Sequence, residues 1–118
     1  MNPTTQTLKD GSKIIRYKND KGNYHRNDGP AYIRYYPNGQ IQYEEYWDNG
    51  RYHNMFGPAL TKYSEDGKID FIEYYIYSNL ITELWLKTID ELLLDNDRTK
   101  WDENEWDMFH FHLVLKIA

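Results

Sequence analysis

Residues 24–39, YHRNDGPAYIRYYPNG, have a near copy 28 positions downstream in residues 52–67, YHNMFGPALTKYSEDG. Aligning residues 25–52 with residues 53–80 without a gap gives nine identical pairs. They are His25/His53, Gly29/Gly57, Pro30/Pro58, Ala31/Ala59, Tyr35/Tyr63, Gly39/Gly67, Ile41/Ile69, Glu45/Glu73 and Tyr46/Tyr74. The sequence therefore predicts a tandem repeat, and the repeat decides the fold.

The same spacing reaches toward the N-terminus. Gly11, Gly22 and Tyr24 each recur as the same residue type 28 positions later, which indicates an imperfect first copy. Ser78 stands where a further turn glycine would fall, so we expect the array to end there.

Each copy is punctuated by Asp-Gly or Asn-Gly pairs. These pairs adopt positive φ at low cost, as tight hairpin turns require, and their flanks are rich in Tyr, Ile, Trp and Phe. The repeats are therefore predicted to form short antiparallel strands, with the Gly-Pro-Ala units at strand entrances. The pairs are Asp10-Gly11, Asn38-Gly39, Asn49-Gly50 and Asp66-Gly67.

Alternation along the strands assigns two faces. Odd positions are mostly apolar and are predicted to face the core: Ile33, Tyr35, Ile41, Tyr43, Trp47, Tyr63, Ile69, Phe71, Tyr75 and Tyr77. Even positions mix charged and aromatic residues. Glu45 and Glu73 break the odd pattern at one repeat position, and we expect each carboxylate to accept hydrogen bonds from a turn or from the repeat histidine.

The C-terminal forty residues offer a second layer. From Ser78 to about Leu94, apolar residues fall at helical spacing and predict an amphipathic helix: Ile81, Leu84, Trp85, Ile89, Leu92 and Leu93. Thr99 and Asp102 can cap a second helix over residues 106–117. A strand is the alternative for that segment, because its apolar residues also alternate.

Together these features predict one α+β domain spanning residues 1–118. Its first part, residues 8–77, would be an antiparallel meander of about six strands. Its second part, residues 78–118, would be a helical cover on the odd face, because a single sheet needs a second layer to bury its apolar side.

The quoted residues resemble MORN-type repeats. The segments YPNGQIQYEEYWDNGRYH and YSEDGKIDFIEYY are similar to the variant of the form Tyr-x-x-Asn/Asp-Gly followed by a Tyr-rich strand, as in bacterial antitoxin-like proteins. The His-x-x-x-Gly-Pro-Ala unit resembles a longer version found in phage and large-virus proteins. The resemblance covers roughly residues 8–77, and it implies a β-sheet scaffold that binds proteins or phospholipid headgroups and, in antitoxin-like members, neutralises a partner protein.

Charge and composition indicate which class of partner the chain binds. Residues 1–40 carry seven Lys/Arg and three Asp/Glu, whereas residues 41–118 carry seven and sixteen. The acidic larger part disfavours direct nucleic-acid binding and favours a protein partner with a basic surface. The chain has no cysteine, no recognisable leader and no apolar run near the roughly 18 residues of a membrane span. We therefore expect a soluble protein of the cytoplasm, which could be the host cytoplasm of a virus, and we do not expect membrane association.

No motif for catalysis or for a cofactor stands out. The sequence has no nucleophile elbow, phosphate loop or dinucleotide fingerprint. Glu44 and Glu45 would point to opposite faces of one strand and could not act together. The histidines, His25, His53, His110 and His112, do not match a zinc signature. We therefore predict no enzyme, cofactor or metal.

Two surfaces are predicted to bind the partner. The even sheet face would present Tyr32, Arg34, Tyr36, Glu44, Tyr46 and Tyr74; the alternative is ordinary cross-strand packing on a solvated face. The segment WDENEWD, residues 101–107, supplies Asp102, Glu103 and Glu105, either as a helix N-terminus or as an acidic docking patch.

The predicted function is non-catalytic protein binding, as a small acidic phage-type or antitoxin-type inhibitor of a nucleic-acid-acting enzyme or a host defence protein. The alternatives are a lipid-binding module and a small hydrolase. The first would use Lys9, Lys13, Arg16 and Lys18, and the second Glu44, Glu103 or Glu105.

Overall fold

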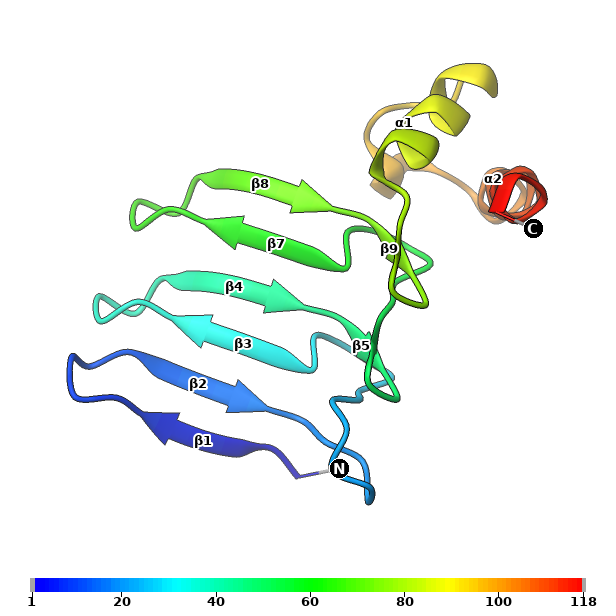
Figure 1. Ribbon diagram of the computed structural model, residues 1–118. Coiled ribbons are helices and arrows are strands. Elements are labelled where there is room, and N and C mark those ends of the chain that lie inside the picture. The colour runs from blue at the N-terminus through cyan, green and yellow to red at the C-terminus, as the bar shows by residue number, and fades with distance from the viewer. Residues whose placement is uncertain (1, 118) are drawn as a thin grey trace. The chain divides into compact units, whose positions relative to one another are not determined.

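The computed structural model describes residues 2–117, which divide into two compact units, residues 2–80 and 81–117 (Figure 1). The first unit is built of antiparallel strands and the second of helices, so the predicted α+β class is confirmed. The prediction that the helices cover one face of the sheet stays a prediction.

A six-stranded antiparallel sheet forms most of the first unit (Figure 1). Its strand order is β1-β2-β3-β4-β7-β8, so neighbours in this order pair with one another and β1 and β8 form the two edges. The strands are β1 (Thr4–Thr7), β2 (Lys13–Arg16), β3 (Tyr32–Tyr35), β4 (Ile41–Glu45), β7 (Leu60–Tyr63) and β8 (Ile69–Glu73). As predicted, both Gly-Pro-Ala units directly precede a strand, β3 and β7.

The three long hairpins turn in the same way. In each, one backbone N–H donates to the carbonyl four residues on, at 2.8 Å: Leu8 to Ser12, Tyr36 to Gln40 and Ser64 to Lys68. In each, an Asx carboxyl or amide oxygen accepts the N–H two residues later: Asp10 from Ser12, Asn38 from Gln40 and Asp66 from Lys68. The glycine that follows the Asx residue has φ near +90° in all three turns, Gly11, Gly39 and Gly67. The turn chemistry thus recurs every 28 residues.

Two short hairpins follow the longer ones. They consist of β5 (Trp47–Asp48) with β6 (Arg51–Tyr52), and β9 (Tyr75–Ile76) with β10 (Asn79–Leu80). The first turns through Asn49-Gly50 and the second through Tyr77-Ser78, and all four residues have positive φ. The turn at Ser78 is therefore made without a glycine, and the strand that follows it ends at Leu80.

The predicted assignment of odd positions to one face is wrong. Arg34 on β3 lies opposite Tyr43 on β4, and Ile33 lies opposite Glu44. Even residues of β3 therefore share a face with odd residues of β4, and the same happens between β7 and β8. The physical reason is the bulge next to each turn, which changes the pairing by one residue.

The register defines two faces of the sheet. Face A holds two rows of paired residues: Thr4, Arg16, Tyr32, Glu45, Leu60 and Glu73; and Gln6, Ile14, Arg34, Tyr43, Lys62 and Phe71. Face B holds Thr5, Ile15, Ile33, Glu44, Thr61 and Ile72. Charged residues occur on both faces.

Burial also differs from the prediction. Three supposed core residues are exposed: Ile69, Phe71 and Tyr77. The buried apolar residues of the first unit are instead Ile14, Ala31, Ala59, Tyr74 and Ile76. Ala31 and Ala59 stand at the same repeat position, and each donates its N–H to a β-strand carbonyl, of Glu45 and Glu73 respectively. An alanine fits at both positions, where the segment before the strand lies directly against the neighbouring strand.

The second unit has its own apolar core. It contains α1 (Thr82–Glu91), a 3₁₀ turn (Arg98–Lys100) and α2 (Glu103–Ile117), so helix is confirmed over strand for residues 106–117. Its buried residues are Ile81, Trp85, Thr88, Ile89, Trp101, Phe109 and Leu113. Within residues 2–117, no helix has the length and apolar character needed to cross a bilayer.

Candidate functional site

The residues predicted for the even sheet face do not share one face. Tyr32 and Arg34 lie together on face A, but Glu44 lies on face B, where its Oε1 accepts a hydrogen bond from the Tyr63 hydroxyl at 2.7 Å. The prediction failed because it carried one parity through a bulged turn. Glu44 and Glu45 do lie on opposite faces, as expected.

The remaining tyrosines of that set have structural contacts. The Tyr36 hydroxyl donates to the Tyr63 carbonyl at 2.7 Å and so ties one long hairpin to the next. Tyr46 joins the neighbouring hairpin through its backbone, since its N–H donates to the Ala59 carbonyl at 2.7 Å. Tyr74 is only 5% exposed, so its ring belongs to the buried apolar residues of the first unit.

A ladder of aromatic rings runs beside face A, and of its members only Tyr32 was a predicted site residue. Trp47 stacks on Tyr52 with ring centroids 3.9 Å apart, and Tyr52 stacks on Tyr75 at 4.9 Å. Tyr24 adjoins Trp47 at 5.4 Å and meets Tyr32 edge-on at 5.8 Å. All five rings are partly exposed, and the stacked faces of Trp47, Tyr52 and Tyr75 are covered by one another.

The sequence signal for this ladder was the repeat itself. Tyr24 and Tyr52 are 28 residues apart, and so are Trp47 and Tyr75. Residues at equal repeat positions come to lie in line across neighbouring hairpins, so aromatic residues at two such positions predict a row of rings.

The Glu45 carboxylate lies against this ladder. Its Oε1 accepts from the Trp47 indole N–H at 3.0 Å and from the Tyr52 hydroxyl at 3.3 Å, and Glu73 accepts from Tyr75 at 3.5 Å. The expected histidine or turn partner is therefore wrong: the donors are aromatic side chains. Burial raises the pKa of the Glu45 carboxyl above its ordinary value, although the two hydrogen bonds act in the opposite direction.

Glu45→Gln should stabilise the sheet at neutral pH. The folded protein binds the Glu45 proton more tightly than the unfolded chain does, so Glu45 lowers stability as pH rises from about 4.5 through the raised pKa. Gln keeps the accepting oxygen and removes the charge. After allowance for solvent screening, we expect the free energy of unfolding to rise by roughly 0.5–1 kcal/mol at pH 7.

Urea unfolding at pH 7 and at pH 4 checks this prediction, since the gain should vanish once the carboxyl is protonated. Glu65→Gln, in an exposed turn, is the control, and should change stability by less than about 0.5 kcal/mol. A loss of stability in Glu45→Gln at pH 7 would contradict the reasoning.

The two repeat histidines close the short hairpins. The Nδ1 atom of His25 accepts the N–H of Asn49, and that of His53 accepts the N–H of Tyr77, both at 3.1 Å. Burial lowers the pKa of His53 and so favours the neutral, accepting form. His110 and His112 lie on α2, and no group of three potential metal ligands occurs within residues 2–117.

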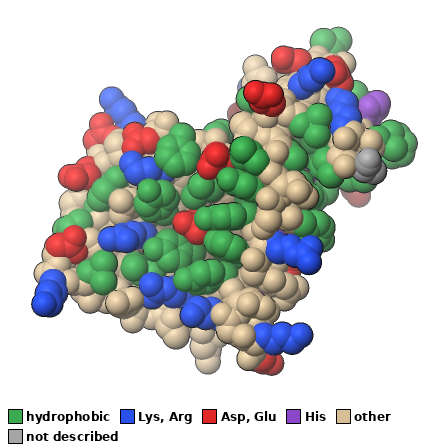
Figure 2. Space-filling view, in the orientation of Figure 1, with side chains coloured by type: hydrophobic (Ala, Val, Ile, Leu, Met, Phe, Trp, Pro, Cys, Tyr) green, Lys and Arg blue, Asp and Glu red, His purple; other side chains and the backbone are tan. Residues whose placement is uncertain are grey.

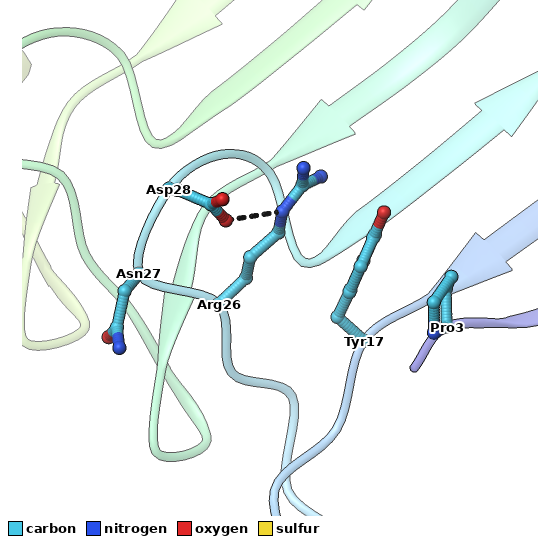
Figure 3. Close-up of a pocket in the computed structure, with 5 residues that line it drawn as sticks. All are labelled: Pro3, Tyr17, Arg26, Asn27 and Asp28. Carbon is cyan, nitrogen blue, oxygen red and sulfur yellow. Dashed lines mark hydrogen bonds and ion pairs between the residues drawn. The ribbon is translucent and has the colours of Figure 1, made fainter. Parts of the chain in front are cut away.

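A surface pocket of about 460 Å³ lies near the N-terminus and is lined by Pro3, Tyr17, Arg26, Asn27 and Asp28 (Figure 3). The Arg26 side chain donates to Asp28 at 2.9 Å and to the Pro30 carbonyl at 3.2 Å, and its guanidinium carbon is 4.0 Å from the Tyr17 ring centroid. Arg26 also lowers the pKa of the Asp28 carboxyl, so Asp28 is a poor general base near pH 7.

Arg26 braces its loop. Asn54, the equivalent residue one repeat later, likewise donates its side-chain amide to the Pro58 carbonyl, at 3.0 Å. The shared contact is with the loop backbone, so the side chain at this repeat position holds the loop in place.

The predicted acidic residues form the start of α2. The Asp102 carboxylate accepts the Glu105 N–H at 2.8 Å, and the Glu105 carboxylate accepts the Asp102 N–H at 3.2 Å. This reciprocal capping box fits the helix N-terminus interpretation of WDENEWD. Glu103 is exposed in the first turn.

An exposed apolar stripe on α2 was not predicted as a site. Met108, Phe111 and Leu115 follow helical spacing and are 40%, 63% and 61% exposed, and the adjacent Val114 is 49% exposed. The buried residues Phe109 and Leu113 occupy a different side of the helix. The alternation at positions 109–117, which suggested a strand, reflects a helix that is apolar on both sides.

Charge is divided unevenly between the units. Residues 1–80 carry ten Lys/Arg and ten Asp/Glu, whereas residues 81–118 carry four and nine. Over the strands, cationic and anionic side chains are scattered among hydrophobic ones (Figure 2). The surplus negative charge of the chain is therefore a property of the helical unit.

Comparisons of the chain with protein-family models, with curated proteins and with solved structures find no match.

Proposed function

We propose that this chain is a non-catalytic protein-binding module whose helical unit contacts a partner with a basic, partly apolar surface. The observation that carries the proposal is the α2 stripe of Met108, Phe111, Val114 and Leu115, exposed in a unit with nine acids and four bases. Exposed apolar stripes on soluble helices are typical of docking surfaces, and the surrounding acids select a basic rim.

The finer identity of the partner is part of this proposal. An enzyme that acts on nucleic acid carries a basic surface that an acidic module can occupy, so inhibition of such an enzyme, or of a host defence protein, is the favoured role. The resemblance of residues 8–77 to MORN-type repeats supports a scaffold role for the sheet. Face A, with Arg16, Tyr32 and Arg34 partly exposed, offers a second contact surface.

A paired variant tests the proposal. The full chain is immobilised, a lysate of the source organism is passed over it, and each recovered protein is purified and titrated calorimetrically. Phe111→Ser with Leu115→Ser should weaken the binding of that protein about tenfold or more, because two apolar anchors are lost. Leu93→Ser, which changes a 91% exposed leucine outside α2, is the matched control and should bind normally.

Salt provides an independent readout. Raising the ionic strength from about 50 to about 300 mM should weaken binding if the helical acids meet a basic surface. A loss of several kcal/mol of stability in the Phe111/Leu115 variant, as buried side chains would give, would overturn the proposal, because the stripe would then be packed within the protein. Salt-sensitive sedimentation with anionic liposomes, lost on changing Lys9, Lys13, Arg16 and Lys18, would support the lipid-binding alternative instead.

A further inference from the structure

Strand β8 ends the six-stranded sheet, and its residues Ile69 and Phe71 are 59% and 42% exposed (Figure 1). It pairs with β7, and within residues 2–117 no strand pairs with its other side. An edge strand presents N–H and C=O groups at alternate residues and is a template for another strand.

The strand register shows which strand of the sheet β8 corresponds to. The pairs of β7 with β8 are those of β3 with β4 with each number raised by 28: for example Tyr32 with Glu45, and Leu60 with Glu73. The bulges also recur, at 34/35 and 62/63. Strand β8 is therefore the equivalent of β4.

Strand β4 uses its second edge to bind the next hairpin. Glu44 lies opposite Thr61 on β7, and the Tyr46 N–H donates to the Ala59 carbonyl. Backbone N–H and C=O groups along a strand point to the same side at every second residue. Since the Tyr46 N–H points toward β7, the N–H and C=O of Glu44, two residues earlier, also point toward β7. The residue equivalent to Glu44 on β8 is Ile72.

The chain does not continue the repeat to fill this position. The segment 28 residues after Gly57–Tyr63, the GPALTKY of β7, is residues 85–91, which lie in α1. The β8 edge thus keeps the strand-accepting pattern of β4, but the following sequence forms a helix.

We propose that β8 binds an extended basic segment of a partner protein as a seventh strand, in the register that β7 takes on β4. In that register one side chain of the guest lies opposite Phe71 and another, two residues away, opposite Glu73. Lys or Arg suits both places, through a cation–π contact and an ion pair. Strand β8 contains two acids, Asp70 and Glu73, and no base, so pairing with β8 of a second copy would set acid near acid.

The inference is independent of the α2 stripe. Either surface can fail while the other binds, because the variants that test them lie on different elements.

The probe is the synthetic peptide GPAKTKY, which is residues 57–63, GPALTKY, with Lys in place of the leucine that would lie opposite Glu73. Added to the full chain, it should slow amide exchange at Ile72, measured by NMR. Methylating the backbone nitrogen of the single threonine of GPAKTKY, the equivalent of Thr61, should weaken binding about tenfold, since one or two hydrogen bonds are lost. The peptide GPALTKY, which keeps the native leucine, should bind more weakly than GPAKTKY, because it lacks the cation opposite Glu73.

Ile72→Pro is the matching protein variant. It removes the outward N–H but no hydrogen bond to β7, and proline is tolerated at such edge positions. It should lose peptide binding while keeping the melting temperature. If Ile72→Pro does not fold, the methylated peptide still decides the matter on the unmodified protein.

Three results would overturn the proposal. The first is peptide binding that is indifferent to N-methylation. The second is an Ile72 amide already protected in dilute free protein, because the edge would then be covered. The third is protection that appears only as protein concentration rises, which would make a second copy the occupant.

Discussion

Phe109→Ala is expected to lower the free energy of unfolding of the helical unit by about 3–5 kcal/mol. Phe109 is fully buried, and its ring centroid lies 4.7 Å from that of Trp85 and 4.9 Å from that of Trp101. Alanine would leave a cavity where three aromatic rings now meet, in a unit of only 38 residues. The loss is therefore comparable with the whole stability such a unit can have.

Tryptophan fluorescence during denaturant unfolding measures this effect, since three of the four Trp residues, Trp85, Trp101 and Trp106, belong to the helical unit. Phe111→Ala is the matched control on the same helix, because Phe111 is 63% exposed and should cost less than about 1 kcal/mol. Equal effects of the two substitutions would show that the burial pattern of α2 is wrong.

Tyr52→Ala should destabilise the sheet unit by about 3 kcal/mol. Tyr52 stacks on Trp47 on one side and on Tyr75 on the other, and its hydroxyl donates to Glu45. Removing the ring opens the middle of the ladder and takes one donor from a carboxylate that burial already penalises.

Tyr52→Phe separates the ring from the hydroxyl. It retains both stacks and loses one long hydrogen bond, so it should cost about 1 kcal/mol or less. Circular dichroism melts of the two variants provide the comparison. If Tyr52→Phe were as damaging as Tyr52→Ala, the hydroxyl rather than the stacking would hold the ladder together.

The hairpins could be predicted from sequence because their signals are local. Asp10, Asn38 and Asp66 each form the turn within their own few residues, and Asp102 with Glu105 caps α2 in the same local way. Such contacts do not depend on the rest of the chain, so a pattern of residue types is enough to find them.

The faces could not be predicted because they depend on one residue of register. A bulge between Arg34 and Tyr35, with its repeat between Lys62 and Tyr63, reverses the parity between paired strands. No residue type at those positions marks the bulge. The same wrong parity produced the wrong site: the prediction put Glu44 on the same face as Tyr32, and it assigned Trp47 and Tyr75 to a core instead of to the ladder.

The hydrogen bonds between the long hairpins determine where the sheet opens first. The middle hairpin β3–β4 is hydrogen-bonded to a hairpin on each side, whereas the outer hairpins β1–β2 and β7–β8 each have such a neighbour on one side within the described sheet. Opening an end therefore breaks fewer bonds than opening the middle. Fraying should start at the outer hairpins and move inward, so the array can flex at its margin while its centre stays closed.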